Sequence, residues 1–320
     1  MAYRDMQYDR KTAKVARYYE KVKDGRFGIP VSLQVALCDA CFNRCIMCDH
    51  PSRPIMKRMD AARWIDKLEF FASRGLESVC YSGGDPMAYS DFNLVMESHI
   101  REAVEFGMTI TGYVPPTIDL QLLKHAAWVR VSLDAVTPEI YEKVRGKVNV
   151  SKVLASIKAM VAADVNIGLG ITLHADNIGD IDNVLAFAAS QGITDIETHH
   201  IEPDSGVRAI RVPEKWERKI EPFQNCHAAL YQLYIDAGGD VYPCCITAGD
   251  AHAAPQAYAI ANIWDDPSWD FDIWPKVVAY SRLKYSDLPP ICRECCIQRL
   301  SQINSICGEM EKSVTDKSFF

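Results

Sequence analysis

No stretch of this 320-residue sequence is apolar over the length that a membrane-spanning helix requires. The first residues, MAYRDMQYDRKTAKVARYYEKVKDGR, are polar and basic and lack the apolar region of a secretory signal. Basic residues are not in excess, and the net charge of −7 argues against broad binding to a phosphate backbone. These absences lead us to expect a cytoplasmic protein with no membrane partner and no nucleic-acid partner.

Cysteine, by contrast, is abundant. The twelve cysteines of a chain without an export signal are expected to be ligands or free thiols rather than disulfides. Three of them, Cys41, Cys45 and Cys48, follow an apolar run directly. Thiolates at this spacing can hold three corners of a four-iron cluster, and since such clusters normally take four thiolates, one iron is left open. The alternative is a zinc or structural thiol site, although zinc sites favour paired C-x2-C units.

Strand-like and helix-like segments alternate along the first two thirds of the chain. The expected strands are Ser32–Leu37, Ser78–Ser82, Met108–Tyr113, Val129–Leu133, Asn166–Leu173 and Ile193–Thr198. Between them lie helical patterns, among them Asp91–Phe106, which Gly107 would end. This alternation predicts an α/β fold with a parallel sheet, and six units fit a partial (β/α)6 barrel of the TIM type. In such barrels the active site lies at the C-terminal ends of the strands.

The pattern changes after residue 205, where Gly, Pro and Cys become frequent. A turn at Gly238-Gly239-Asp240 predicts a β-hairpin between two short apolar segments. We therefore expect four parts: a helical extension (1–30), the α/β core (31–215), a small cysteine-rich domain (216–310) and a tail (311–320).

Polar residues follow several predicted strands. The second strand ends in Gly83-Gly84-Asp85-Pro86, where glycines allow a ligand to approach the backbone closely. Ser132 and Asp134 share one side of the fourth strand. The plainer interpretations, a tight turn and a capped strand end, stay open for these segments. Further candidates at strand ends are Thr172 and His174, which share one face of the fifth strand, Tyr81 and Tyr113 as pocket lining, and His199, His200 and Glu202 as proton acceptors or substrate ligands.

In this order, the motifs resemble those of the radical S-adenosylmethionine (SAM) enzymes. Cys41, Cys45 and Cys48 match the family's C-x3-C-x2-C signature, Gly83–Pro86 its Gly-Gly-Asp-Pro segment, and Ser132–Asp134 its Ser-Leu-Asp segment. The resemblance implies that the open iron of a [4Fe–4S] cluster binds SAM, which one electron cleaves to a 5′-deoxyadenosyl radical. It also implies that Gly83–Pro86 contacts the SAM amino group and that Ser132 and Asp134 reach its ribose and carboxylate, with Thr172 near the adenosine.

The C-terminal cysteines resemble the SPASM/twitch extension of these enzymes, which holds auxiliary [4Fe–4S] clusters. Ser301 breaks the two-cluster SPASM pattern, so the resemblance favours the twitch version with one cluster. A structural zinc site is the alternative, because C-x2-C also suits zinc. The resemblance implies four ligands, Cys226, Cys244, Cys292 and Cys295, with Cys245 or Cys296 as a replacement; Cys38, Cys80 and Cys307 are left over.

A fully ligated auxiliary cluster implies electron transfer, as in the 2-deoxy-scyllo-inosamine dehydrogenases, which this chain resembles in architecture. We expect hydrogen abstraction from a small polyhydroxylated or nucleotide-like metabolite, with an electron donor such as flavodoxin or ferredoxin. One alternative is a peptide-modifying epimerase or cross-linking enzyme, for which the roughly thirty residues before the first strand are too few to form a recognition domain. The other is a non-catalytic iron–sulfur carrier, which would leave the SAM-contacting segments without a role.

Overall fold

The structure is a computed structural model that describes residues 30–48, 56–200, 225–250, 258–265, 273–288 and 292. The side chains of His199 and His200 are not part of this description. The predictions for the N-terminal extension, Glu202, Cys295, Cys296, Cys307 and the C-terminal tail also lie outside it.

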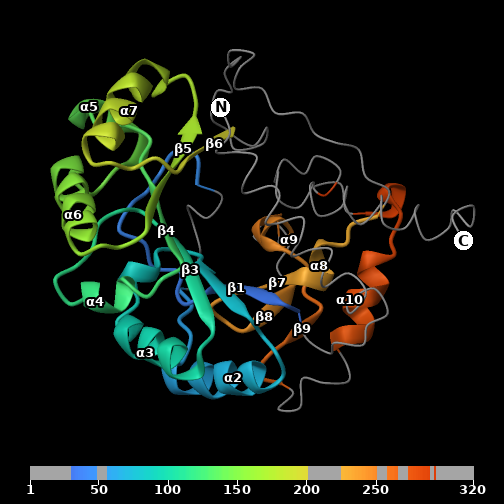
Figure 1. Cartoon of the computed structure of the whole chain (residues 1–320). Coiled ribbons are helices and arrows are strands. Elements are labelled where there is room, and N and C mark those ends of the chain that lie inside the picture. The colour runs from blue at the N-terminus through green and yellow to red at the C-terminus, as the bar shows by residue number, and fades with distance from the viewer. Residues whose placement is uncertain are drawn as a thin grey trace, which may run out of the picture.

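Six parallel strands follow one another in the order of the sequence across the sheet (Figure 1). Each crossover carries at least one helix, which is the βα arrangement that the sequence predicts. The sheet curves without closing, so the α/β class and the partial (β/α)6 barrel are confirmed. The strands are β1 (Ser32–Ala36), β2 (Ser78–Ser82), β3 (Glu105–Ile110), β4 (Trp128–Ser132), β5 (Ile167–Leu173) and β6 (Ile196–His200).

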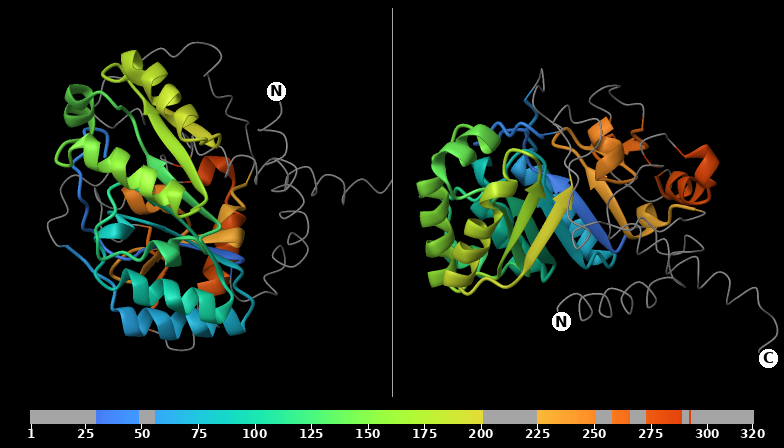
Figure 2. Two further views of the ribbon diagram at one scale, coloured as in Figure 1. Left: turned by 60° about the vertical axis from the view of Figure 1, so that its left-hand side comes forward. Right: turned by 90° about the horizontal axis from the view of Figure 1, so that it is seen from above.

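Helices cover the outer face of this sheet (Figure 2). In α2 (Ala61–Ser73), the side chain of Asp60 caps the first turn, and Trp64, Leu68 and Phe71 are buried at helical spacing. The side chains of Asp119 and Asn149 cap two of the other helices in the same way, whereas three helices begin without a side-chain cap and are placed by their buried apolar residues. The five other helices are α3 (Phe92–Glu102), α4 (Leu120–Leu123), α5 (Pro138–Arg145), α6 (Val150–Ala162) and α7 (Ile181–Ser190).

The boundary between α3 and β3 differs from the prediction. The helix ends at Glu102, four residues early, because Ala103 adopts a left-handed conformation with φ 53°. Phe106 is then a buried strand residue rather than the last residue of a helix. Gly107 does not end a helix either. It lies in β3, where a Cβ would come within 2.3 Å of the Trp128 ring, so glycine makes room for the indole.

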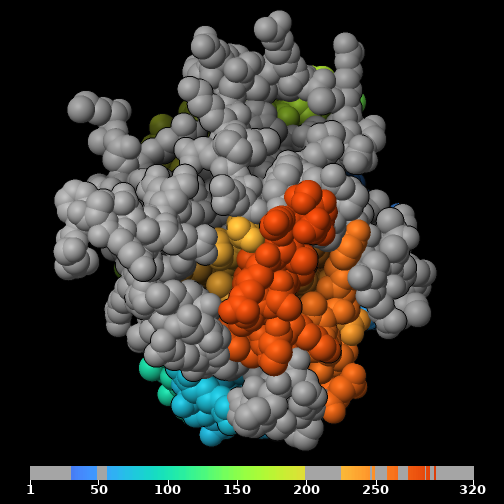
Figure 3. Space-filling view, turned by 90° about the vertical axis from the view of Figure 1, so that its right-hand side faces the viewer, coloured from blue at the N-terminus to red at the C-terminus, as the bar shows by residue number. Residues whose placement is uncertain are grey.

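The cysteine-rich region extends the same sheet. The predicted hairpin is confirmed as β7 (Gln232–Ile235) and β8 (Asp240–Tyr242), which pair antiparallel, and β9 (Ala261–Asn262) follows β8. The sequence does not predict that β7 pairs in parallel with β1 and joins both regions into one sheet. The helices here are α8 (Ala228–Tyr231), α9 (Cys245–Asp250) and α10 (Ile273–Ser281), and α10 lies on the outer surface (Figure 3).

The two faces of the strands differ in chemistry. Leu33 and Val35 of β1 are fully buried in the core shared with the helices, whereas Gln34 points to the opposite, open face and donates to Ser82 at 3.0 Å. On the same open face, Arg130 of β4 forms an ion pair with Glu197 of β6. The inside of the partial barrel is therefore polar. None of the described helices has the length and apolar character needed to cross a bilayer.

Candidate functional site

The first three cysteines lie in the loop that follows β1, at the C-terminal end of the parallel strands. Cys41 and Cys48 are exposed and Cys45 is half-buried. The loop is ordered by contacts with α5 and the residues around it. The main-chain N–H of Arg44 donates to the carbonyl of Arg145 at 3.0 Å, and the buried Asn43 amide donates to the Tyr141 hydroxyl at 3.1 Å. The protein thus holds the loop in place while two thiols stay accessible.

Arg145 connects this loop to the end of β4. Its guanidinium is buried, with Nε 2.6 Å from Asp134 Oδ2 and Nη1 3.5 Å from Cys45 Sγ. Burial lowers the pKa of Arg145, but Asp134, Cys45 and Tyr141 together raise it by more, so the pKa lies above its usual value and Arg145 stays charged. Sequence reasoning gave this residue no role, because nothing in the sequence shows that its side chain reaches Asp134 and Cys45.

Asp134 is fully buried and binds within the protein. Besides the ion pair with Arg145, one oxygen accepts the Thr172 N–H at 2.7 Å. These contacts tie β4, β5 and α5 together beside the cysteine loop. Ser132 and Thr172 are half-buried near the same strand ends. The SAM contacts that the sequence implies for these residues stay a prediction.

The glycines after β2 pack against the cysteine loop itself. The N–H of Gly84 donates to the Cys38 carbonyl at 3.0 Å. A Cβ on Gly84 would lie 2.2 Å from the Ala40 oxygen, and one on Gly83 would lie 2.4 Å from Ala36 Cβ. Both positions therefore exclude a side chain, because Ala36 of β1 occupies that space at Gly83 and the backbone of the cysteine loop occupies it at Gly84.

Asp85 turns its side chain into the protein. It is fully buried and accepts hydrogen bonds from the Met87 N–H, the Thr111 N–H and the Thr111 hydroxyl. Burial raises the pKa of Asp85 to about 6, and the hydrogen bonds limit the rise. Both carboxylate oxygens have partners, so a SAM contact from Gly83–Pro86 would come from the main chain.

Three other residues that the sequence predicts near the site, Tyr81, Tyr113 and His174, lie in different surroundings. Tyr81 as pocket lining is wrong, because the side chain is fully buried on the helix side, where Trp64 donates to its hydroxyl at 3.0 Å. Tyr113 lies beside the cysteine loop, with its ring centroid 5.1 Å from that of Phe42. His174 is fully buried in a turn.

The sixth-strand candidates are placed only by their backbone. His199 pairs with Thr172 and His200 with Leu173 at the C-terminal end of β6. This is the edge of the sheet that carries the cysteine loop. Their role as proton acceptors, like that of Glu202, stays a prediction.

A second group of cysteines comes from three separate segments. Cys226 precedes α8, Cys244 follows β8, and Cys292 comes after α10. Burial raises the pKa of Cys244 well above its usual value, and the nearby Cys245, Cys226 and Cys292 raise it further. The described thiols of this region are therefore neighbours, although no three His, Cys, Asp or Glu side chains of the described residues are grouped as a metal site requires. Tyr280 of α10 joins them, with its hydroxyl 3.2 Å from Cys292 Sγ.

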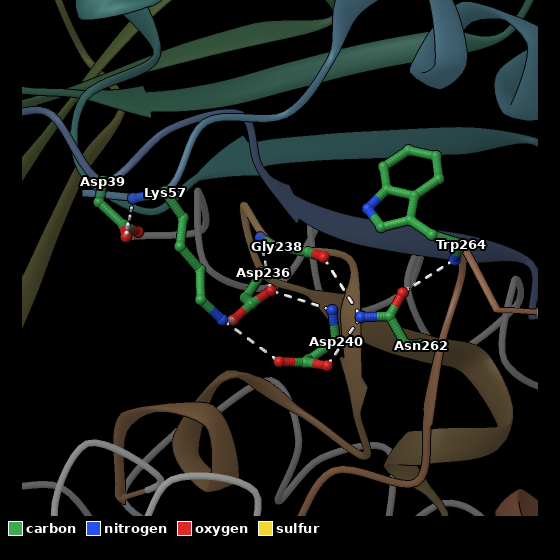
Figure 4. Close-up of polar contacts among 7 residues, drawn as sticks. All are labelled: Asp39, Lys57, Asp236, Gly238, Asp240, Asn262 and Trp264. Carbon is green, nitrogen blue, oxygen red and sulfur yellow. Dashed lines mark hydrogen bonds and ion pairs between the residues drawn. The ribbon is translucent and has the colours of Figure 1, made fainter. Parts of the chain in front are cut away.

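Lys57 links the cysteine loop to the β7–β8 hairpin (Figure 4). Its main chain exchanges two hydrogen bonds with Asp39, at 2.9 and 3.0 Å. Its ammonium lies 3.0 Å from Asp236 and 3.3 Å from Asp240, and Asn262 of β9 donates to Asp240 at 2.8 Å. The residues just before Cys41 are thus fixed relative to the strand pair that leads to Cys244.

Comparison with known families agrees with this arrangement. The Radical SAM superfamily matches residues 35–188, and the iron–sulfur cluster-binding SPASM domain matches residues 226–296. The chain belongs to the radical SAM superfamily and carries a SPASM domain. Members of this superfamily are enzymes of radical chemistry, and the cofactors that the sequence predicts, SAM and [4Fe–4S] clusters, are confirmed. The domain boundaries that the sequence predicts stay a prediction.

Two kinds of curated relative share the core. The probable GTP 3′,8-cyclase of Thermococcus kodakarensis is 28% identical over 172 residues, 52% of this chain and 56% of the relative. The PqqA peptide cyclase of Gluconobacter oxydans is 26% identical over 176 residues, 53% of this chain and 49% of the relative. The chain thus spans about half the length of the curated relatives it matches.

Solved structures extend the likeness over more of the chain. SuiB of Streptococcus suis, bound to its precursor peptide SuiA, aligns with a TM-score of 0.64 and 14% identity over 89% of this chain and 74% of SuiB. Native anSMEcpe with bound AdoMet aligns with a TM-score of 0.60 and 14% identity over 88% of this chain and 95% of that protein. At this level of identity, the likeness shows a shared fold.

Proposed function

We propose that this chain cleaves SAM reductively at a [4Fe–4S] cluster held by Cys41, Cys45 and Cys48, and that the 5′-deoxyadenosyl radical removes a hydrogen atom from a substrate. One observation carries the proposal. Main-chain contacts with α5 and Gly84 order the loop, and two of its three cysteines are exposed. A cluster on three thiolates supplies an open iron for SAM and the electron that cleaves it.

The surrounding residues would position this site. Arg145 places a positive charge 3.5 Å from the Cys45 sulfur, where it would attract the negative charge of a cluster held by thiolates. The main chain of Gly83–Pro86 packs on the loop and would present its polar groups to the SAM amino group. Ser132 and Thr172 would lie near the ribose and adenosine, with Asp134 acting through Arg145 and the Thr172 N–H.

The second group of cysteines would hold one auxiliary [4Fe–4S] cluster through Cys226, Cys244, Cys292 and Cys295. The proximity of the first three, which come from separate segments, supports this set. With four protein ligands, the cluster has no open iron, so its role would be to accept an electron. The substrate radical would then lose one electron to this cluster and one proton to His199, His200 or Glu202.

A small polyhydroxylated or nucleotide-like metabolite is the first candidate substrate. The open face of the sheet supports it, because hydroxyl, amide and charged groups line this face and suit a polar molecule. The resemblance to a GTP 3′,8-cyclase points in the same direction. The reductant would be a protein such as flavodoxin or ferredoxin, in the cytoplasm.

A peptide is the second candidate substrate. The PqqA peptide cyclase, 26% identical over half of this chain, favours it. Deuterated substrates distinguish the two candidates. A deuterated nucleoside or sugar is compared with a deuterated peptide, and the substrate of the enzyme is the one that transfers deuterium to 5′-deoxyadenosine. Transfer from a peptide alone would overturn the metabolite proposal.

SAM cleavage tests the activity itself. After anaerobic reconstitution, the protein with SAM and dithionite is expected to form 5′-deoxyadenosine and methionine, measured by mass spectrometry. Cys45→Ser should abolish this product, whereas Cys80→Ser, a buried cysteine on β2 outside the loop, should retain it. A protein that binds SAM and never cleaves it would leave only the iron–sulfur carrier.

Iron analysis tests the two clusters. About eight irons and eight sulfides per chain are expected from two four-iron clusters. Replacing both Cys292 and Cys295 by serine should remove about half of that iron, because the first cluster uses other ligands. About four irons and one zinc in the unaltered protein would instead identify the second group as a structural zinc site.

A further inference from the structure

Tyr280 is the neighbour of the second cysteine group that no part of the proposed function uses. It lies on α10, which packs against α8 beside the segment that carries Cys226. Its hydroxyl lies 3.2 Å from Cys292 Sγ, within the distance of an O–H···S hydrogen bond. The tyrosine is half-buried, and its hydroxyl lies against the Cys292 sulfur.

The direction of this hydrogen bond follows from the chemistry of the two groups. A cysteine that ligates iron is a thiolate, which has no proton to give and can only accept. A tyrosine hydroxyl carries its proton at neutral pH and can donate it. The bond would therefore run from Tyr280 to the sulfur of Cys292 whenever that cysteine is a ligand.

A donor to a ligating sulfur changes the electron affinity of a cluster. Reduction adds negative charge to the iron–sulfur core and its thiolates, so a hydrogen bond to a sulfur is stronger in the reduced state than in the oxidised state. Hydrogen bonds to the sulfurs are one of the determinants of iron–sulfur potentials. Such a hydrogen bond always raises the reduction potential of the cluster, because the donor favours the reduced state.

Helix α10, which carries Tyr280, is fixed to the rest of the protein by packing and hydrogen bonds. Ile273, Trp274 and Val277 of α10 are buried, and Asn225 next to Cys226 donates to the main-chain oxygens of Arg282 and Leu283. The end of α10 is thereby attached to the segment that begins the second cysteine group. Tyr280 therefore lies on a helix that is packed and hydrogen-bonded beside the second cysteine group.

We infer that Tyr280 is a positioning residue that donates a hydrogen bond to the Cys292 sulfur and raises the reduction potential of the auxiliary cluster, so that it takes up the electron of the substrate radical more readily. The inference rests on the proposed auxiliary cluster. Tyr280 touches neither substrate nor SAM in this account.

The experiment compares Tyr280→Phe with the unaltered, reconstituted protein by redox titration followed by electron paramagnetic resonance. Loss of the donor is expected to make reduction of the auxiliary cluster about tenfold less favourable, which is about 59 mV to lower potential for a one-electron couple. The first cluster should keep its potential. Tyr89→Phe is the matched control, because it removes a buried hydroxyl that donates to the Met59 carbonyl, away from the second cysteine group.

Each other result contradicts the inference. An auxiliary potential that is unchanged in Tyr280→Phe, with about eight irons retained, would overturn it. Loss of about four irons in this variant would also overturn it, because Tyr280 would then be needed to assemble the site. Zinc in place of the second cluster in the unaltered protein would instead refute the proposed function, and it would be seen before any variant is compared.

Discussion

Among single residues, the buried hydrogen bonds that connect Trp64, Tyr81 and His99 show how packing determines the protonation state of a side chain. Trp64 donates to Tyr81, the Tyr81 hydroxyl lies 2.6 Å from His99 Nε2, and His99 Nδ1 lies 3.0 Å from the Val104 carbonyl. A carbonyl only accepts, so Nδ1 carries the proton and Nε2 accepts from Tyr81. Every polar atom of these three side chains is satisfied with His99 neutral.

This neutral histidine predicts a pH dependence. Burial lowers the pKa of His99 to about 4, below its usual value near 6.5. Protons therefore bind the unfolded state preferentially, and stability falls as pH drops through 6.5 toward 4. We expect about 2 kcal/mol of this loss between pH 7 and pH 5. Urea unfolding of His99→Gln should show a shallower decline, and an equal slope in both proteins would contradict the assignment.

Gly84 predicts a defect confined to the first cluster. A methyl group there would overlap the Ala40 oxygen, so Gly84→Ala must displace the cysteine loop, at a cost of about 1–3 kcal/mol for overpacking. Iron analysis should show about half of the iron lost, as expected when one of two four-iron clusters fails to assemble. Gly179→Ala is the control, because its Cβ would meet nothing within 4 Å. Full iron content in Gly84→Ala would contradict the packing argument.

Among the helices and strands, α5 does more than connect two strands of the sheet, because it also holds the cysteine loop. Its last turn supplies both a main-chain acceptor for the cysteine loop and the guanidinium between Asp134 and Cys45. The loop therefore depends on a helix that lies about a hundred residues later in the chain. Sequence spacing alone gives no sign of this dependence.

The ion pair of α5 gives a test that uses two variants. Arg145→Leu leaves Asp134 buried without its partner and should lower stability by about 3–5 kcal/mol. Adding Asp134→Asn removes the unpaired charge and should recover part of the loss. Thermal unfolding of both variants measures the difference. A double variant no more stable than Arg145→Leu would show that the charge is not the cause.

The elements themselves were largely predictable. The strands of the core and the hairpin appear close to where alternation and turn residues place them, with β3 and β6 displaced by two or three residues, since local patterns determine local structure. The end of α3 was not, because Ala103 in a left-handed conformation and the Trp128 ring over Gly107 depend on tertiary packing. The cysteine triplet and the segments around it were found by motif. Arg145, Tyr280 and Lys57 were not, because each acts through a partner distant in sequence.

For the whole molecule, the parallel pairing of β1 with β7 is the main unforeseen feature. Each residue from Ser32 to Val35 has a partner in β7, and Lys57 adds ion pairs to Asp236 and Asp240 at one end of this pairing. Main-chain hydrogen bonds join the regions in a single sheet, so the two regions are expected to unfold together.

This arrangement predicts one unfolding transition. Lys57→Met should lower stability by less than about 1 kcal/mol, because the Lys57 side chain is 41% exposed and such ion pairs are weak, while the strand pairing remains. Calorimetry should therefore show a single transition in the unaltered protein and in the variant. Lys158→Met, an exposed lysine of α6, is the control. Two separate transitions would contradict the single sheet.

The place of β1 between β2 and β7 also limits how the chain can be divided. If the region from residue 225 onward were removed, β1 would become an edge strand with a row of unpaired main-chain groups. Such an edge invites pairing with other chains and aggregation. The core is therefore not an interchangeable module: a fragment or chimera that keeps the SAM-binding half would need a substitute for β7 to stay monomeric.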